Sequence, residues 1–167
     1  RTTAGAACTQ CPGQEETCFC VAGFTGPDNG ECTMCSPGTY KAVNGSAECL
    51  SCGAGTYQNA SGATAPSCEP CPLNTNSLLG SDAITDCICQ AGFVGVDGAA
   101  CSSCGVGTFK ASNGSMACNL CDSGTYQNGT GASQCAACPG NTDSMVGSDQ
   151  VTDCICNVGF EGSDGAA

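Results

Sequence analysis

Cysteine is the feature that most restricts what this chain can fold into. The sequence has 20 cysteines in 167 residues, and most of them stand in Cys-x-x-Cys or Cys-x-Cys pairs. Only 21 residues are Leu, Ile, Val or Phe, which is too little large apolar side chain for an ordinary core. Closing a loop of ~15 residues with a disulfide is worth roughly 3 kcal/mol in the chain-entropy model, so cross-links can order a backbone that burial alone could not. The sequence therefore predicts a small disulfide-rich fold.

The cysteines belong to an internal repeat. The stretch "CTMCSPGTYKAVNGSAEC" at 32 aligns with "CSSCGVGTFKASNGSMAC" at 101, an offset of 69 that falls to 67 after a two-residue deletion. Each copy has eight cysteines: Cys32, Cys35, Cys49, Cys52, Cys68, Cys71, Cys87 and Cys89, matched by Cys101, Cys104, Cys118, Cys121, Cys135, Cys138, Cys154 and Cys156. We expect the C-terminal part of an upstream repeat in 1–34, a full repeat in 35–103, and a second repeat in 104–167 that stops before its last cysteine.

Turn signals indicate many short strands. "GTYK", "GTFK", "GTYQ" and "CICQAGF" can each form a short strand, whereas Asn-Gly at 44, 113 and 128 and Asp-Gly at 97 and 164 favour tight turns. No window keeps helical periodicity for long. The expected architecture is a set of tandem, elongated cysteine-rich modules with short two-stranded β-ribbons and little or no helix.

Two cysteine patterns resemble known extracellular modules. In a strand, residues i and i+2 point to the same face, so Cys87 and Cys89 can fasten that face to two different neighbours. The stretch "CICQAGFVGVDGAAC" resembles the C-terminal half of an epidermal-growth-factor-like module. The stretches "CSSCGVGTFKASNGSMAC" and "CPGNTDSMVGSDQVTDCIC" resemble the cysteine-rich, ephrin-receptor-like repeats of extracellular proteins.

The resemblance implies a disulfide pattern. Growth-factor-like pairing gives Cys52–Cys71, Cys68–Cys87 and Cys89–Cys101, and the last loop of laminin-type modules gives Cys104–Cys118. Along the repeat this adds Cys8–Cys18, Cys20–Cys32, Cys35–Cys49, Cys121–Cys138 and Cys135–Cys154, and leaves Cys11 and Cys156 to pair beyond this stretch. Because the unit is longer than either parent module, strictly sequential pairing, such as Cys71 with Cys87, stays open.

The same cysteines have a second interpretation. Cys32/Cys35 and Cys49/Cys52 have zinc-ribbon-like spacing, but the unbroken cysteine series, the Cys-x-Cys pairs and the scarcity of basic residues favour disulfides. A thioredoxin-like redox role needs a strand-to-helix context that the sequence lacks. We expect no metal site.

Four Asn-x-Ser/Thr triplets recur in register. Asn44 matches Asn113 and Asn59 matches Asn128, all on expected loop tips, where a glycan does not block packing. N-linked glycans and disulfides both require the secretory pathway, which predicts an extracellular or cell-surface protein.

Repeated acids are another candidate site. Asp82 and Asp86, repeated as Asp149 and Asp153, could hold calcium with backbone carbonyls. The Asp-x-Asp/Asn-Glu run of calcium-binding growth-factor modules is absent, however, so we expect these residues to cap turns.

Charge and composition exclude several functions. Three basic residues, Arg1, Lys41 and Lys110, stand against fifteen acids, a net charge of −12, so nucleic acid is not an expected partner. No apolar run approaches a spanning helix, which predicts no direct membrane insertion. The chain has no His and no carboxylate pair held in a core, so we expect no enzyme and no cofactor.

Two non-enzymatic functions remain. The aromatics recur in register, and the Ala, Gly, Ser and Thr content with "GTY", "NGS" and "TDCIC" phrases resembles repetitive surface proteins such as those of flagellar hairs (mastigonemes). That resemblance implies a structural glycoprotein that self-associates into a filament, held by disulfides and coated by glycans. The alternative is a ligand-binding or adhesion ectodomain of a cell-surface receptor.

Overall fold

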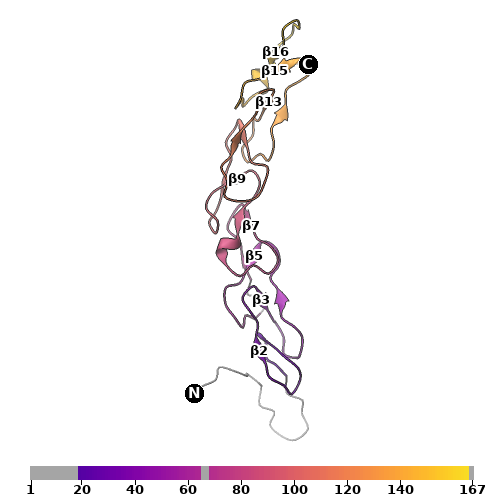
Figure 1. Cartoon of the computed structure of the whole chain (residues 1–167), viewed down its shortest axis with the longest axis vertical. Coiled ribbons are helices and arrows are strands. Elements are labelled where there is room, and N and C mark those ends of the chain that lie inside the picture. Colours follow the sequence, from indigo (N-terminus) through magenta and orange to yellow (C-terminus); the bar gives the residue numbers. More distant parts are fainter. Residues whose placement is uncertain (1–18, 65–67, 166–167) are drawn as a thin grey trace. The chain divides into compact units, whose positions relative to one another are not determined.

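The fold consists of very short strands joined by turns (Figure 1). The computed structural model describes residues 19–64 and 68–165. Within them lie two short 3-10 helices, η1 (Ile84–Asp86) and η2 (Val151–Asp153), and sixteen strands of two residues each. The strands are β1 (Phe24–Thr25), β2 (Thr33–Met34), β3 (Thr39–Tyr40), β4 (Leu50–Ser51), β5 (Thr56–Tyr57), β6 (Glu69–Pro70), β7 (Thr75–Asn76), β8 (Ile88–Cys89), β9 (Phe93–Val94), β10 (Ser102–Ser103), β11 (Thr108–Phe109), β12 (Asn119–Leu120), β13 (Thr125–Tyr126), β14 (Ala136–Ala137), β15 (Thr142–Asp143) and β16 (Ile155–Cys156).

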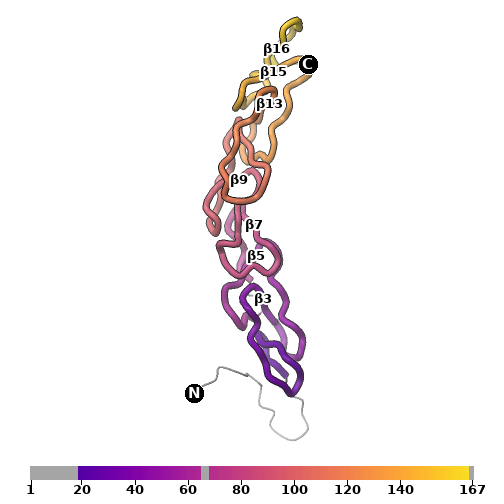
Figure 2. Tube along the Cα trace, in the orientation of Figure 1, coloured from indigo at the N-terminus to yellow at the C-terminus, as the bar shows by residue number. Residues whose placement is uncertain are grey.

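The chain forms two compact units. The first contains the described residues up to Cys71 and Asn76–Cys87, and the second contains Pro72–Thr75 and the described residues from Ile88 onward. Antiparallel hairpins β1–β2, β3–β4 and β5–β6 belong to the first unit, and β9–β10, β11–β12, β13–β14 and β15–β16 belong to the second. Figure 2 shows the hairpins following one another in sequence order within each unit. The expected small disulfide-rich fold of tandem ribbons is confirmed. The repeat boundaries at 34/35 and 103/104 stay predictions.

One hairpin plan is used throughout. In β3–β4, Cys35 lies four residues before the first strand, and its disulfide partner Cys49 lies directly before the second strand. The same two positions are bridged in every hairpin of the described chain. The eight bridges are Cys20–Cys32, Cys35–Cys49, Cys52–Cys68, Cys71–Cys87, Cys89–Cys101, Cys104–Cys118, Cys121–Cys135 and Cys138–Cys154.

This plan corrects part of the predicted pairing. Cys20–Cys32, Cys35–Cys49, Cys89–Cys101 and Cys104–Cys118 are present as predicted. The crossed pairs Cys52–Cys71, Cys68–Cys87, Cys121–Cys138 and Cys135–Cys154 are wrong, and the sequential alternative is right. The reason is the hairpin: an antiparallel return brings the cysteine before the second strand next to the cysteine that opened the same hairpin. The second cysteine of a Cys-x-x-Cys pair then opens the next hairpin.

Three cysteines of the upstream segment cannot be placed. Cys8 and Cys18, predicted to pair with each other, and Cys11, predicted to pair elsewhere, lie outside the described residues. Cys156 is a free, half-buried thiol in the described chain. It occupies the hairpin-opening position, because Gly159 and Phe160 follow it as Gly92 and Phe93 follow Cys89.

A tight turn opens each hairpin. Three residues after Cys35, Gly38 adopts φ +78°, and the Thr39 amide donates to the Ser36 carbonyl at 3.1 Å. With Pro37 before it, this is the residue order of a type II turn, in which the third residue needs positive φ. Asn74 and Asn141, with φ of 61° and 62°, occupy the same position after Cys71 and Cys138. Asn is the non-glycine residue best suited to that conformation.

Successive hairpins are joined by backbone hydrogen bonds. The Gly38 amide donates to the Gln58 carbonyl of the next hairpin at 2.7 Å, and the Gly62 amide donates back to the Cys35 carbonyl at 2.8 Å. The Gly38 backbone also lies close to the second hairpin along the chain. A Cβ on Gly38 would lie only 2.1 Å from the Gly80 carbonyl oxygen of that hairpin. The same close approach recurs at Gly92, whose Cβ would lie 2.1 Å from the Gly131 oxygen. Within a unit, the backbone itself is the packing surface.

Disulfides and two lysine side chains fill the core of the described chain. The largest fully buried side chains in the described chain are two lysines, Lys41 and Lys110, followed by half-cystines. Large aliphatic residues are mostly exposed, as Leu78 and Met145 show, each 83% accessible. Disulfides therefore do replace an apolar core, as the composition indicates.

Candidate interaction surface

The two buried lysines hold the first sequon loop of each repeat. Lys110, 2% exposed, donates from Nζ to the carbonyl of Phe93 at 2.6 Å and to the carbonyl of Gly114. Lys41 does the same to Phe24, at 2.6 Å, and Gly45. Gly45 and Gly114 are the middle residues of the Asn-Gly-Ser triplets. The sequence analysis counted these lysines only as charges, and their identical place in "GTYK" and "GTFK" was the available signal.

Burial changes the titration of one lysine. Desolvation lowers the pKa of Lys110, and the charge of Asp97 partly opposes this effect. Asp97 Oδ1 is itself buried and has no hydrogen-bond partner within the described residues. The ammonium is therefore held mainly by neutral carbonyl oxygens.

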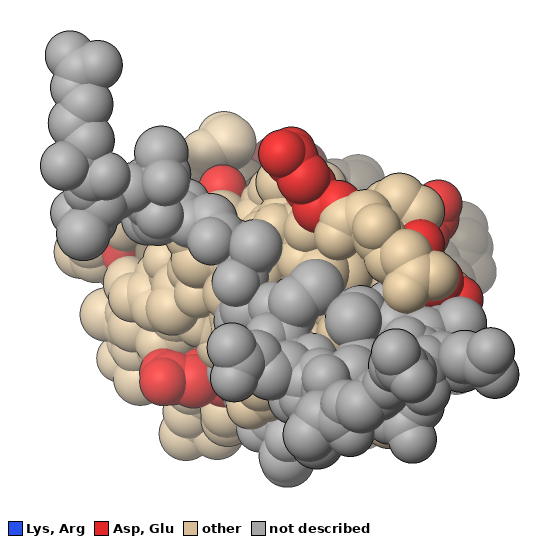
Figure 3. Space-filling model, turned by 90° about the horizontal axis from the view of Figure 1, so that it is seen from below, with Lys and Arg blue, Asp and Glu red and all other residues tan. Residues whose placement is uncertain are grey.

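The buried lysines leave an acidic surface. Arg1 lies outside the described residues, so the part of the chain that the structure describes exposes acidic side chains and no cationic ones. Figure 3 shows acidic groups, and no Lys or Arg, on the face in view. Like charges across this surface resist contact between copies of the chain and favour cationic partners.

The four sequon asparagines are exposed. Asn44, Asn59, Asn113 and Asn128 all lie at the surface. Asn44 Oδ1 accepts a hydrogen bond from the Ala22 amide at 3.0 Å, and Asn113 Oδ1 accepts one from the Ala91 amide at 2.9 Å. These bonds use the oxygen and leave the amide nitrogen, the atom that carries an N-glycan. Glycosylation at the four sites stays a prediction.

The repeated aspartates cap turns. Asp86 Oδ2 accepts from the amides of Asp82 and Ala83, both at 3.0 Å. Asp153 does the same for Asp149 and Gln150. The turn-capping interpretation is therefore confirmed for Asp86 and Asp153, whereas Asp82 and Asp149 contribute their backbone amides to these turns. Among residues 19–64 and 68–165, no group of three or more potential ligands is placed to hold a metal ion.

Each repeat also presents an exposed apolar pair on a fixed turn. Leu78 and Leu79, 83% and 72% exposed, precede Gly80, and Met145 and Val146, 83% and 61% exposed, precede Gly147. Ser148 Oγ donates to the Met145 carbonyl at 2.8 Å, and Ser81 Oγ donates to the Leu78 carbonyl at 2.9 Å. The sequence analysis did not identify these pairs, although "SLLG" and "SMVG" recur in register.

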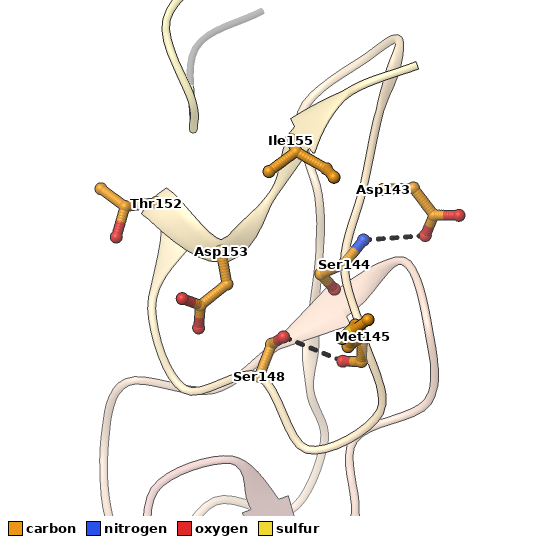
Figure 4. Close-up of a pocket in the computed structure, with 7 residues that line it drawn as sticks. All are labelled: Asp143, Ser144, Met145, Ser148, Thr152, Asp153 and Ile155. Atoms are coloured by element: carbon orange, nitrogen blue, oxygen red, sulfur yellow. Dashed lines mark hydrogen bonds between the residues drawn. The ribbon is translucent and has the colours of Figure 1, made fainter. Parts of the chain in front are cut away.

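An open pocket lies beside the second pair (Figure 4). It has a volume of about 490 Å³ and is lined by Asp143, Ser144, Met145, Ser148, Thr152, Asp153 and Ile155. These residues come from β15, from the turn that follows it, from η2 and from the start of β16, so the single hairpin bridged by Cys138–Cys154 forms the whole pocket. The lining combines two exposed apolar side chains, Met145 and Ile155, with acidic groups.

Tandem disulfide-closed hairpins with a sulfur core and polar, acidic loops define a cysteine-rich repeat of the extracellular or secreted type. The family model for "tyrosine-protein kinase ephrin type A/B receptor-like" sequences matches residues 23–67, 44–87 and 111–154. The chain belongs to this family, which confirms the resemblance seen in its cysteine spacing. Among the described residues, no helix is both long enough and apolar enough to cross a membrane.

The chain is also similar to a named receptor. It is 37% identical over 83 residues to ephrin type-B receptor 3 of Xenopus laevis. That match covers 48% of this chain and 6% of the relative. The similarity therefore concerns one small cysteine-rich part of a much longer protein.

Proposed function

We propose that the chain is part of an extracellular ectodomain that binds a protein ligand or a neighbouring cell surface. The observation that carries the proposal is membership in the ephrin-receptor-like family over most of the chain. The fixed turns that present Leu78–Leu79 and Met145–Val146 to solvent supply apolar contact points of the kind that a protein partner buries. The role is binding, not catalysis.

The filament function finds no support in the comparisons. Uniform repeats are expected of a filament, but one shared hairpin plan produces such uniformity in a receptor segment as well as in a fibre. The surface of the described residues argues against close self-association, because it exposes acids without cations. Self-association stays an untested prediction.

Cell binding tests the proposal. The glycosylated chain, secreted from cells and labelled, should bind a subset of cell types saturably, and trypsin treatment of those cells should abolish binding. A matched preparation whose disulfides are reduced and alkylated should not bind. If no cell type binds the folded chain, and electron microscopy of the same material shows regular filaments, the ectodomain proposal is wrong and the filament function takes its place.

A further inference from the structure

The loops that connect the two strands of a hairpin fall into two classes. In each repeat, three loops are locked by the same backbone bond of 2.8 Å, from a loop glycine to a hairpin-opening cysteine. The bonds are Gly45 to Cys20, Gly62 to Cys35 and Gly80 to Cys52, and then Gly114 to Cys89, Gly131 to Cys104 and Gly147 to Cys121. Two loops of each repeat carry sequons, and the third carries the exposed apolar pair and no sequon.

In the second unit, the glycan-free loop borders the pocket of Figure 4. Met145 belongs to the apolar pair, and Ile155, 59% exposed, lies on the opposite strand. The Asp153 side chain enters the same space from η2 in this view. Ser144 and Ser148 form its inner wall, because both are buried.

Each of the two acidic side chains of the pocket has one carboxylate oxygen that a ligand could bind. Asp153 uses Oδ2 for the backbone amides of Asp149 and Gln150. Asp143 uses Oδ1 for the Ser144 amide at 2.8 Å. The second oxygen of each carboxylate has no hydrogen bond within the described residues. A carboxylate with a free oxygen beside apolar side chains matches an amphipathic cation, which packs its alkyl stem and presents its charge at the tip.

We propose that the Asp143–Ile155 pocket receives an arginine or lysine side chain of a protein partner, with Met145 and Val146 packing on apolar residues beside that cation. The occupant follows from charge complementarity. A second copy of this chain cannot supply it from the described residues, because Lys41 and Lys110 are buried in every copy. The inference rests on the proposed binding function and specifies the chemistry of the partner.

The preceding copy of the repeat offers a natural comparison in sequence. The corresponding positions there are Asn76, Leu78, Asp86 and Ile88, so that copy retains the apolar pair and the capping acid but has a neutral amide in place of Asp143. Asn76 Oδ1 accepts from the Ser77 amide at 3.0 Å, as Asp143 does from Ser144. The variant Asp143→Asn therefore copies a conformation that the repeat already uses, and removes only the charge.

Amide chemical-shift mapping on the full oxidised chain tests the pocket. The probes are acetyl-Leu-Arg-Leu-amide and its citrulline analogue, which is neutral and of nearly the same shape. We expect the arginine peptide to shift the amides of Met145, Asp153 and Ile155, with the citrulline peptide binding about twofold to fivefold more weakly. Asp143→Asn and Asp153→Asn should each weaken arginine-peptide binding by a similar factor. Asn at 153 keeps an oxygen for the turn amides.

The control removes an acid elsewhere in the same unit. Asp122→Asn also removes one negative charge but lies outside the pocket, so it should leave the affinity unchanged. The proposal is overturned if Asp122→Asn weakens binding as much as Asp153→Asn, or if millimolar peptide shifts no pocket amide. If the chain binds cells but the peptide shifts no pocket amide, the proposed function stands and this inference is wrong. If the peptide binds in the pocket but the chain binds no cell type, the inference about the pocket stands and the proposed function is wrong.

Discussion

At the scale of single residues, glycine decides which hairpins can approach each other. Gly92 combines φ +84° with a position where any Cβ would lie 2.1 Å from the Gly131 carbonyl oxygen. The positive φ disfavours any residue other than glycine. The Gly131 carbonyl, which is part of the backbone and has little room to move, leaves no space for a Cβ. A residue with no side chain is therefore as important for packing here as a leucine is in an ordinary core.

We expect Gly92→Ala to open the junction between hairpins. Left-handed strain alone costs roughly 1–3 kcal/mol, and the backbone contact adds to it. The amide of Gly131, bonded to the Cys104 carbonyl, should then exchange with solvent about thirtyfold faster if local stability falls by about 2 kcal/mol. Gly105→Ala is the matched control, since a Cβ there meets nothing within 4 Å. Equal exchange rates in the two variants would contradict this role for glycine.

Lys110 should titrate below its ordinary pKa of 10.5. Burial disfavours the ammonium, so between the lowered pKa and 10.5 the unfolded chain binds more protons than the native chain. Stability therefore rises with pH across that window. The lysine Cε resonance, assigned by its loss in Lys110→Met, reports the midpoint. A Cys156→Ser background removes the free thiol of the described residues, which would shuffle disulfides at alkaline pH. A midpoint at or above 10.5 would show that the carbonyl ligands outweigh desolvation.

At the scale of elements, the unit of construction is a single bridged hairpin, much smaller than the eight-cysteine repeat. The sequence was sufficient to predict short ribbons, the turns at Asp97 and Asp164 and half of the eight bridges, whereas the Asn-Gly sites at 44, 113 and 128 do not form tight turns. It failed on Cys52, Cys68, Cys71 and Cys87 because the growth-factor resemblance covers only the Cys-x-Cys hairpin. The phrase Cys-x-x-Gly-Thr or Cys-x-x-Gly-Phe, with Asn for Gly after Cys71 and Cys138, marks every hairpin start in the described chain. Read as one motif, it assigns each bridge to its own hairpin.

Other features of the site were beyond sequence reasoning. The burial of Lys41 and Lys110 depends in part on the Phe24 and Phe93 carbonyls of the preceding hairpin, 17 residues away, and the recurrence of the lysine in "GTYK" and "GTFK" does not identify those acceptors. The exposure of Leu78 and Met145 opposes the usual tendency of such residues to be buried. Because the described residues form no core of large apolar side chains that could receive them, the turn leaves these side chains exposed to water.

A single cut distinguishes the two disulfide patterns. In the sequential pattern, no bridge of the described chain spans the Ala136–Ala137 bond, whereas the crossed pairs would join both sides of it. With a site-specific protease sequence inserted there, we expect the oxidised chain to separate into two fragments on a non-reducing gel. A cut placed between Cys121 and Cys135 is the control, because its fragments should separate only after reduction. If the fragments stay linked after the first cut, the sequential pattern is wrong and the crossed pairing is right.

At the scale of the whole molecule, the repeat distributes its chemistry by loop. Among the loops locked by glycine, two in each repeat carry sequons and the third carries an apolar pair, and the exposed charges of the described residues are all acidic. Exposed apolar residues on such an acidic, hydrophilic background are suited to specific contact, since charge keeps the rest of the surface soluble.

We expect all four sequons to carry glycans in the secreted chain. Enzymatic deglycosylation should convert Asn44, Asn59, Asn113 and Asn128 to Asp, each detected by mass spectrometry as a gain of about 1 Da. Ser46→Ala removes the acceptor triplet at Asn44 but keeps the Oδ1 bond to Ala22. It should therefore eliminate one glycan and leave the fold intact. An unmodified Asn59 or Asn128 would make these loops available for contact as well, and would weaken the division between the loop classes.

The locality of the bridges has a consequence for biosynthesis. Every disulfide in the described chain joins cysteines 12 to 16 residues apart, and no two bridges overlap in sequence. Each hairpin can therefore be oxidised as soon as its second cysteine enters the lumen, before the rest of the chain has been translated. Maturation can follow the direction of synthesis, with little need for an isomerase to correct distant mispairing.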